Sequence, residues 1–361
     1  MRKKIGILTF HCANNFGAVL QAYALRVFLQ GVYQDADIQI IDYKCKETEP
    51  KIRFSELREK KGFLGAALHY GQIRSMNQKF DQFRAEYLNL SEGCRSRDGL
   101  QTQIGAYRAV ISGSDQVWNL TWSGNDDVYF QNFNHHDSGK FSYAASFGFE
   151  RLNAEQVPFY RESLRRFAGI SVREEAGKRI VEEQLGLRAE RHIDPTLLLG
   201  AEEWRKIAAM PKIKGKYILV YMVPKQNSVV SYAERLRKET GLPIVMLSKN
   251  LKPVNAKHAG DSSPQEFLGW FANAEYVVTN SFHGTAFSLI FHKKLCIELN
   301  NSRGLNIRSR DLLEICGAAI HGTPDKGIIR LSKMDWETVE HTLQKERERS
   351  GRYLSGLLCG D

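Results

Sequence analysis

The sequence predicts an α/β protein made of two domains in tandem, each built around a parallel β-sheet. Short apolar segments of strand length alternate with amphipathic segments of helix length along most of the chain. The chain has 361 residues, which is enough for two domains. Its composition, 42% hydrophobic and 25% charged, is that of a globular protein and excludes wholesale disorder.

The first domain is expected to span residues 1–200. A strand, a helix and a second strand open it, which is the order that begins a parallel sheet, and the same alternation resumes near residue 106. The expected strands are 4–10, 37–43, 106–112, 140–147 and 169–173, and the expected helices are 18–29, 154–167 and 174–185.

Residues 44–105 are expected to form a helical insertion in the first domain. They are basic, lack strong strand signals and show helical patterns at 63–70 and 77–87. The insertion is either a solvated cover over the sheet or a surface that meets a lipid-linked or polymeric acceptor.

The second domain is expected to span residues 201–330, followed by a C-terminal helix within 331–361. The second alternation consists of strands at 217–223, 243–247, 275–280 and 295–299, with helices at 229–240, 285–292 and from 310. Ligands of such sheets bind beyond the carboxyl ends of the strands, so the turns that follow strands are the places to look for a site.

Composition and charge exclude several classes of function. No apolar run approaches the roughly 18 residues of a membrane span, and polar residues interrupt the N-terminal apolar segment too early for a signal peptide, so a cytoplasmic protein is expected. Six cysteines without a CxxC pair or a His/Cys cluster at zinc spacing predict neither a disulfide framework nor a metal site. An excess of 51 basic over 41 acidic residues, +10, favours anionic partners, but no nucleic-acid-binding module is visible.

The strongest local signal is the segment VTNSFHGTAF at 278–287, which runs from a strand through a tight turn into a helix. Backbone N–H groups at a helix start favour an anion, and His283 could bind phosphate or donate a proton there. Gly284 either takes an unusual backbone conformation or allows a close approach. The alternative is that Asn280 and Ser281 only cap the helix and that His283 is an ordinary loop residue.

Two further turns follow strands of the first domain. The turn NNFGA (14–18) lies where a phosphate loop would lie, and the side-chain amides of Asn14 and Asn15 suit sugar hydroxyls or phosphate oxygens, with helix capping as the alternative. In GSDQVWN (113–119), Asp115 is placed to accept a proton from a hydroxyl and Trp118 to stack on a sugar ring. The alternative there is a capping Asp and a core Trp.

Three arginines are candidates for an anion site. Arg173 lies at a strand end just before a helix, and its guanidinium suits bidentate binding of carboxylate or phosphate. Arg308 and Arg310 lie downstream of the last strand, where they could complete the same site. Each alone is equally compatible with a surface ion pair.

Taken together, these segments resemble the polysaccharide pyruvyl transferase family. The matching segments follow the family order over nearly the whole chain: NNFGAVLQAYAL (14–25), GSDQVWN (113–119), SYAASFG (142–148), SVREE (171–175), DPTLLL (194–199) and VTNSFHGTAFSLIFHKKL (278–295), with looser matches at FDQFRAEYLNLS (80–91) and SRDLLEICG (309–317).

The resemblance implies a GT-B-like fold, with two Rossmann-like domains facing each other across a cleft, the first on the acceptor side and the second on the donor side. It implies transfer of a pyruvyl group from phosphoenolpyruvate to a sugar of a bacterial surface or exopolysaccharide precursor. The product is a ketal, phosphate is released, and no metal or organic cofactor is required.

The resemblance also suggests roles for the candidate residues. His283 is the general acid or a phosphate ligand, and Arg173 holds the donor carboxylate or phosphate. Asp115 orients or deprotonates an acceptor hydroxyl. The remaining substrate contacts are Asn15, Gly17 and Trp118 on the acceptor side and Asn280, Ser281, Gly284, Arg308 and Arg310 on the donor side.

Two other functions compete with this interpretation. One is a glycosyltransferase of the same fold that uses a nucleotide-sugar donor, because a fold does not fix a function. The other is a non-catalytic protein that binds carbohydrate or a membrane surface through the basic insertion. Under the transferase hypothesis the partners are phosphoenolpyruvate and a sugar acceptor that is lipid-linked, nucleotide-linked or an oligosaccharide, and peripheral contact with the inner membrane leaflet stays open.

Overall fold

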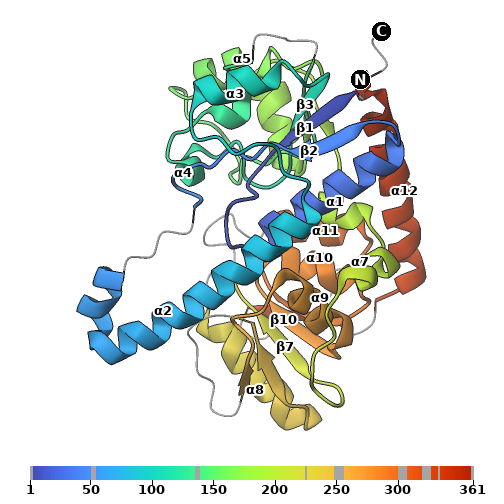
Figure 1. Cartoon of the computed structure of the whole chain (residues 1–361). Coiled ribbons are helices and arrows are strands. Elements are labelled where there is room, and N and C mark those ends of the chain that lie inside the picture. Colours follow the sequence, from blue (N-terminus) through green and yellow to red (C-terminus); the bar gives the residue numbers. More distant parts are fainter. Residues whose placement is uncertain are drawn as a thin grey trace. The chain divides into compact units, whose positions relative to one another are not determined.

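The chain divides into two compact units, and neither is continuous in sequence (Figure 1). Unit 1 comprises Met1–Glu49, Arg84–Leu199 and Leu343–Asp361, and unit 2 comprises Pro50–Phe83 and Gly200–Thr342. The computed structural model describes residues 3–49, 54–134, 139–223, 226–247, 256–299, 307–318, 327–331 and 334–358.

Unit 1 is built on a four-stranded parallel sheet in the order β2-β1-β3-β4. The strands are β1 (Lys4–Leu8), β2 (Asp37–Ile40), β3 (Ala109–Ser112) and β4 (Lys140–Ser142). Ile7 pairs with Ile40 on one side and Ile111 on the other, and all three are buried. Parallel strands covered on both faces read as continuous apolar runs, which is why the sequence identified them.

A short parallel pair, β5 (Ser171–Val172) and β6 (Glu190–Arg191), continues this sheet beyond β4 through isolated bridges. The helices and helical turns of unit 1 are α1 (Phe16–Val32), α3 (Arg97–Ile104), α4 (Leu120–Ser123), η1 (Val128–Phe130), α5 (Val157–Leu164), α6 (Glu175–Arg179), η3 (Ile180–Gln184), η4 (Pro195–Leu198) and η6 (Gly356–Leu358).

Unit 2 is built on a six-stranded sheet in the order β12-β11-β10-β7-β8-β9, parallel except for β12. Its strands are β7 (Ile218–Tyr221), β8 (Ile244–Met246), β9 (Ala256–His258), β10 (Tyr276–Thr279), β11 (Lys294–Glu298) and β12 (Ile328–Leu331). Its helices are α7 (Ala201–Ile207), α8 (Asn227–Thr240), α9 (Pro264–Asn273), α10 (Phe282–Ile290) and α11 (Ile307–Ile315). The sequence did not predict β9, β12 or α9.

Two long helices, α2 (Phe54–Tyr87) and α12 (Trp336–Ser355), each contribute residues to both units. Helical patterns were expected at 63–70 and 77–87, and both lie within α2, which is continuous through Gly71. A glycine lowers helix propensity by about 1 kcal/mol without ending a helix. The division also gives residues 50–83 to unit 2, whereas the prediction placed the whole insertion in the first domain.

The second half of α12 is bound to unit 1 by side chains that donate to backbone carbonyls. Arg347 Nε donates to the carbonyl of Leu197 at 2.8 Å, and the Tyr353 hydroxyl donates to that of Ser142 at 2.9 Å. The Tyr353 ring also packs on the buried His192 ring, with centroids 4.7 Å apart. The second half of this helix is therefore part of unit 1 rather than an appendage. Among the described helices, none is long and apolar enough to cross a membrane.

Candidate functional site

The turn between β10 and α10 lies at the carboxyl edge of the unit 2 sheet. Ser281 caps α10 and accepts a hydrogen bond from the Gly284 amide at 3.4 Å, as the capping alternative predicted. The helix begins at Phe282 rather than at Thr285, so the first-turn N–H groups belong to residues 282–284. The Thr285 amide, at the start of the helix expected from the sequence, is instead bound to the Ser281 carbonyl at 2.9 Å.

Gly284 is required by a close approach and not by an unusual backbone conformation. A Cβ at this position would lie 2.3 Å from Thr279 Oγ1. That hydroxyl cannot move aside freely, since it donates to the Tyr221 carbonyl at 2.6 Å and accepts from the Ser281 amide at 3.0 Å. The glycine thus lets the helix start directly against the end of β10.

His283 and Arg308 both belong to this part of unit 2. His283 lies in the first turn of α10 and is 7% exposed. The Arg308 guanidinium stands over the ring of the neighbouring Phe282, 5.8 Å from its centroid. Arg310 is partly buried two residues further along α11. Asn280, predicted to touch substrate, uses its Oδ1 to accept the Val223 amide at 2.8 Å and joins the ends of β10 and β7.

Asp115 lies at the carboxyl edge of the unit 1 sheet, in the turn after β3. Its φ of 69° is in the left-handed region, which Asp tolerates better than most residues. Its Oδ1 accepts the Gln116 amide at 2.9 Å and lies 3.8 Å from the Arg173 guanidinium. The side chain remains 15% exposed, so the carboxylate can be reached from solvent.

Arg173, predicted to hold a donor anion, is buried among carboxylates. Its side chain is 2% exposed and forms an ion pair with Asp194 at 2.6 Å, with Glu174 at 3.6 Å and Asp115 at 3.8 Å. Burial disfavours the charged guanidinium, but the three carboxylates together raise the pKa of Arg173 above its usual value. Its charge is therefore already balanced within unit 1, and it attracts the Asp115 carboxylate electrostatically.

Trp118 is a correction, because its indole lies in the core and cannot stack on a sugar. It is 0% exposed, packs against Phe130 and Phe147, and donates Nε1–H to the Tyr129 carbonyl at 3.3 Å. The exposed indole is that of Trp122, at 54%. Its Nε1–H donates to Gln116 Oε1 at 3.1 Å, which holds the ring near the Asp115 turn.

The turn before α1 favours the capping alternative. Asn15 caps the helix and accepts the Ala18 amide at 3.3 Å, although its side chain is exposed. Gly17 is buried in the first helical turn, where it is not part of an open loop. Asn14 accepts from the Arg84 guanidinium at 2.6 Å, so the turn is fixed to the end of α2.

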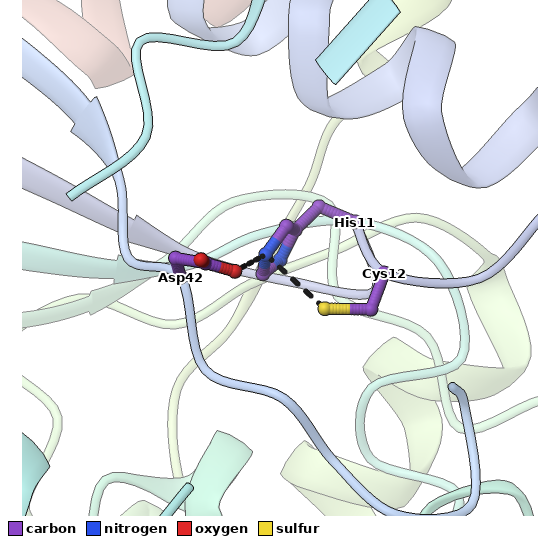
Figure 2. A group of neighbouring side chains, drawn as sticks. All are labelled: His11, Cys12 and Asp42. Carbon is purple, nitrogen blue, oxygen red and sulfur yellow. Dashed lines mark hydrogen bonds and ion pairs between the residues drawn. The ribbon is translucent and has the colours of Figure 1, made fainter. Parts of the chain in front are cut away.

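Sequence analysis missed a group of three side chains beyond β1 and β2, formed by His11, Cys12 and Asp42 (Figure 2). His11 Nε2 lies 3.0 Å from Asp42 Oδ1 and 3.3 Å from Cys12 Sγ. Burial acts against the charged ring, but the contacts with Asp42 and Cys12 raise the pKa of His11 to about 9. Asp42 is distant in sequence from His11 and Cys12 and meets them only because β1 and β2 pair in parallel. No local sequence motif therefore predicts the group.

The chain is similar to a known protein family over most of its length. The family model described as polysaccharide pyruvyl transferase matches residues 15–297, more than half of the chain. The chain belongs to this family. The match includes Asp115 and His283, whereas His11, Cys12, Arg308 and Arg310 lie outside it.

This pyruvyl transferase family member has the GT-B fold, and the likeness that supports it has a TM-score above 0.5. A putative UDP-N-acetylglucosamine 2-epimerase from Listeria monocytogenes aligns with a TM-score of 0.53 at 8% identity, over 98% of this chain and 91% of that one. The UDP-GlcNAc 2-epimerase of Neisseria meningitidis gives 0.49 at 10% identity, covering 99% and 94%. The E. coli heptosyltransferase WaaC gives 0.40 at 9%, covering 95% and 99%. No curated protein sequence matches the chain.

Proposed function

We propose that the protein transfers the pyruvyl (carboxyethylidene) group of phosphoenolpyruvate to a sugar of a bacterial surface or exopolysaccharide precursor, as a cyclic ketal. The family match over residues 15–297 carries the proposal, because it spans the strand edges of both units. The neighbours with the same fold support only the architecture, since their identity to the chain is too low to bear on activity.

The donor is assigned to unit 2. Phosphoenolpyruvate carries a phosphate and a carboxylate, which need cations and N–H groups around them. The start of α10 supplies backbone N–H groups and the positive end of a helix dipole. Arg308 supplies a fixed guanidinium beside this turn, with Arg310 as a second candidate on the same helix. Ser281 and Gly284 shape the turn, and Asn280 fixes it to β7.

The reaction needs one proton delivered and two hydroxyl protons removed. His283 gives a proton to the methylene carbon of the enol, which leaves an oxocarbenium-like centre at the carbon bearing the phosphate. An acceptor hydroxyl forms a C–O bond to this centre, and the bond from the same carbon to the phosphate oxygen breaks. A second hydroxyl closes the ketal ring. Of the two hydroxyl protons, one restores His283 and the other leaves with phosphate.

The acceptor is assigned to unit 1. Asp115 is a partly exposed carboxylate that can accept one hydroxyl proton before that proton leaves with phosphate, and Arg173 positions it. Trp122 offers an exposed, hydrogen-bonded indole near the same turn, which suits the apolar face of a sugar ring. The exposed amide of Asn15 is a further hydroxyl contact in this unit.

The test compares His283→Asn with His292→Asn. His292 lies just beyond the other end of α10, where its exposed ring pairs with Glu340 at 2.9 Å, so it serves as a control histidine outside the turn between β10 and α10. Each protein is incubated with phosphoenolpyruvate and a panel of sugar acceptors, and phosphate release and acceptor mass are measured.

We expect phosphate release with wild type and His292→Asn and its loss with His283→Asn. Product formation by His283→Asn at the wild-type rate would reject the general acid. Turnover of nucleotide-sugars without any reaction of phosphoenolpyruvate would reject the proposed function in favour of glycosyl transfer.

A further inference from the structure

Three different metal-ligating atoms converge beyond the carboxyl ends of β1 and β2 (Figure 2). His11 Nε2, Cys12 Sγ and one carboxylate oxygen of Asp42 all lie within 4.8 Å of one another. Tetrahedral coordination of Zn²⁺ with ordinary bond lengths separates neighbouring ligand atoms by roughly 3.3–3.6 Å. The observed separations from Nε2, 3.0 Å to Oδ1 and 3.3 Å to Sγ, are shorter by only a few tenths of an ångström.

The imidazole of His11 is already oriented as in metal sites. Its Nδ1 lies 3.1 Å from the Thr9 carbonyl, which can only accept, so Nδ1 carries a proton and donates it. This leaves Nε2 as the nitrogen that faces Cys12 and Asp42. Metal-binding histidines almost always donate through their other ring nitrogen in this way.

The arrangement is not that of a cysteine hydrolase. In a cysteine hydrolase the thiol contacts one ring nitrogen of the histidine and the carboxylate contacts the other. The histidine can then take the thiol proton while the carboxylate orients the ring. Here Cys12 and Asp42 both contact Nε2. A bound ion requires ligand atoms that are all directed at one position. A thiolate together with an imidazole favours Zn²⁺ over Mg²⁺ or Ca²⁺.

Two cations lie beside the group. Lys44 Nζ lies 3.6 Å from Asp42 Oδ2, and Arg84 donates to the backbone carbonyls of His11 and Cys12. A divalent ion held by a thiolate, a carboxylate and a neutral imidazole forms a group of zero net charge, which these two cations do not repel as a whole. Arg84 meanwhile fixes the backbone that carries two of the three ligands.

We propose that His11, Cys12 and Asp42 bind a divalent transition-metal ion of the Zn²⁺ class, with a fourth position left for water or another ligand. Cys12 is partly exposed, which gives the ion a way in. The site goes beyond the proposed pyruvyl transfer, and its test needs no activity.

The test uses the full chain without an affinity tag, stripped with a chelator and titrated with Co²⁺. Binding through a thiolate gives a sulfur-to-cobalt charge-transfer band, and Zn²⁺ should displace it. We expect a saturable band of one ion per chain in wild type. The band should be lost in Cys12→Ser, and Co²⁺ affinity should fall by at least about tenfold in Asp42→Asn.

Cys94→Ser is the matched control, because Cys94 is also partly buried and its amide donates to the Asp42 carbonyl at 2.9 Å, yet its thiol is not in the group. Its band should match wild type. Circular dichroism without metal checks that each variant folds. Independently of the variants, Zn²⁺ should slow alkylation of Cys12 in the wild-type chain, followed by mass spectrometry. The absence of a thiolate band, its survival in Cys12→Ser, or unchanged alkylation would overturn the proposal.

Discussion

Replacing Arg173 by methionine separates its role as an ion-pair partner of buried carboxylates from the donor-binding role that the sequence indicated. Asp194 is 0% exposed and Glu174 3%, so the variant leaves buried carboxylates without their cation. Removing one partner of a buried ion pair costs about 3–5 kcal/mol. A domain is stable by about 5–15 kcal/mol in total, so the loss is a large share of it.

The effect is measured by urea unfolding followed by circular dichroism. With an m value of about 2 kcal/mol per molar urea, a loss of 4 kcal/mol lowers the midpoint of the affected transition by about 2 M. Arg165→Met is the control, because Arg165 pairs with Glu162 at the same 2.6 Å distance on the surface. A solvent-exposed pair contributes little, so this midpoint should barely move.

The kcat and KM of an Arg173 variant that still folds provide a second test of its role. In an Arg173 variant that still folds, such as Arg173→Lys, we expect a lower kcat and an unchanged KM for phosphoenolpyruvate, because the guanidinium positions Asp115 and does not touch the donor. An unchanged unfolding midpoint in Arg173→Met together with a raised donor KM in Arg173→Lys would refute the reasoning and restore the role that sequence analysis gave to this residue.

Three further predictions concern stability and use the same unfolding measurement. Trp118→Ala should cost about 3–5 kcal/mol because the indole fills the core, and a normal midpoint with a raised acceptor KM would show instead that it contacts sugar. Gly284→Ala should cost about 1–3 kcal/mol of folding stability because its Cβ would meet Thr279. At Gly71 of α2 a Cβ meets nothing, so Gly71→Ala should stabilise the protein. Equal effects at the two glycines would disprove the close-approach argument. Burial and two nearby arginines lower the pKa of His192 from 6.5 to about 3, so the folded state binds this proton less readily than the unfolded state. Stability should therefore fall as pH drops from 6.5 towards 3, by about 2 kcal/mol at pH 5, and a His192→Gln variant with the same acid sensitivity as wild type would contradict this.

The sequence predicted most of the parallel strands well because the central ones are buried on both faces and carry apolar runs. The edge strand β9 was missed for the opposite reason, because it has a partly exposed and two exposed residues and no apolar run marks it. The other edge strand, β12, was missed although Ile328, Ile329 and Leu331 are buried. Helix α2 runs through both expected helical segments, 63–70 and 77–87, and through the residues between them.

At the candidate site, the sequence predicted the positions of the turns better than the exposure and the surroundings of the side chains. The turns after β3 and β10 were located from local residue types, and the alternatives of helix capping and a core Trp were already in view. Whether Trp118 or Trp122 is exposed depends on packing by residues far away in sequence, such as Phe147 and Phe167. The surroundings of Arg173 likewise include Asp194, whose approach is set by the fold and not by spacing along the chain.

The way α12 closes unit 1 has a consequence for how the chain is assembled during synthesis. Unit 1 begins with the first strand but is completed by residues 343–358, which are made after all of unit 2. Until then the carbonyls of Ser142 and Leu197 lack the hydrogen bonds from Tyr353 and Arg347, and one face of the His192 ring is uncovered. Unit 1 must therefore wait in a partly finished state while unit 2 is being translated, and loss of α12 would damage the part of the molecule that was made first.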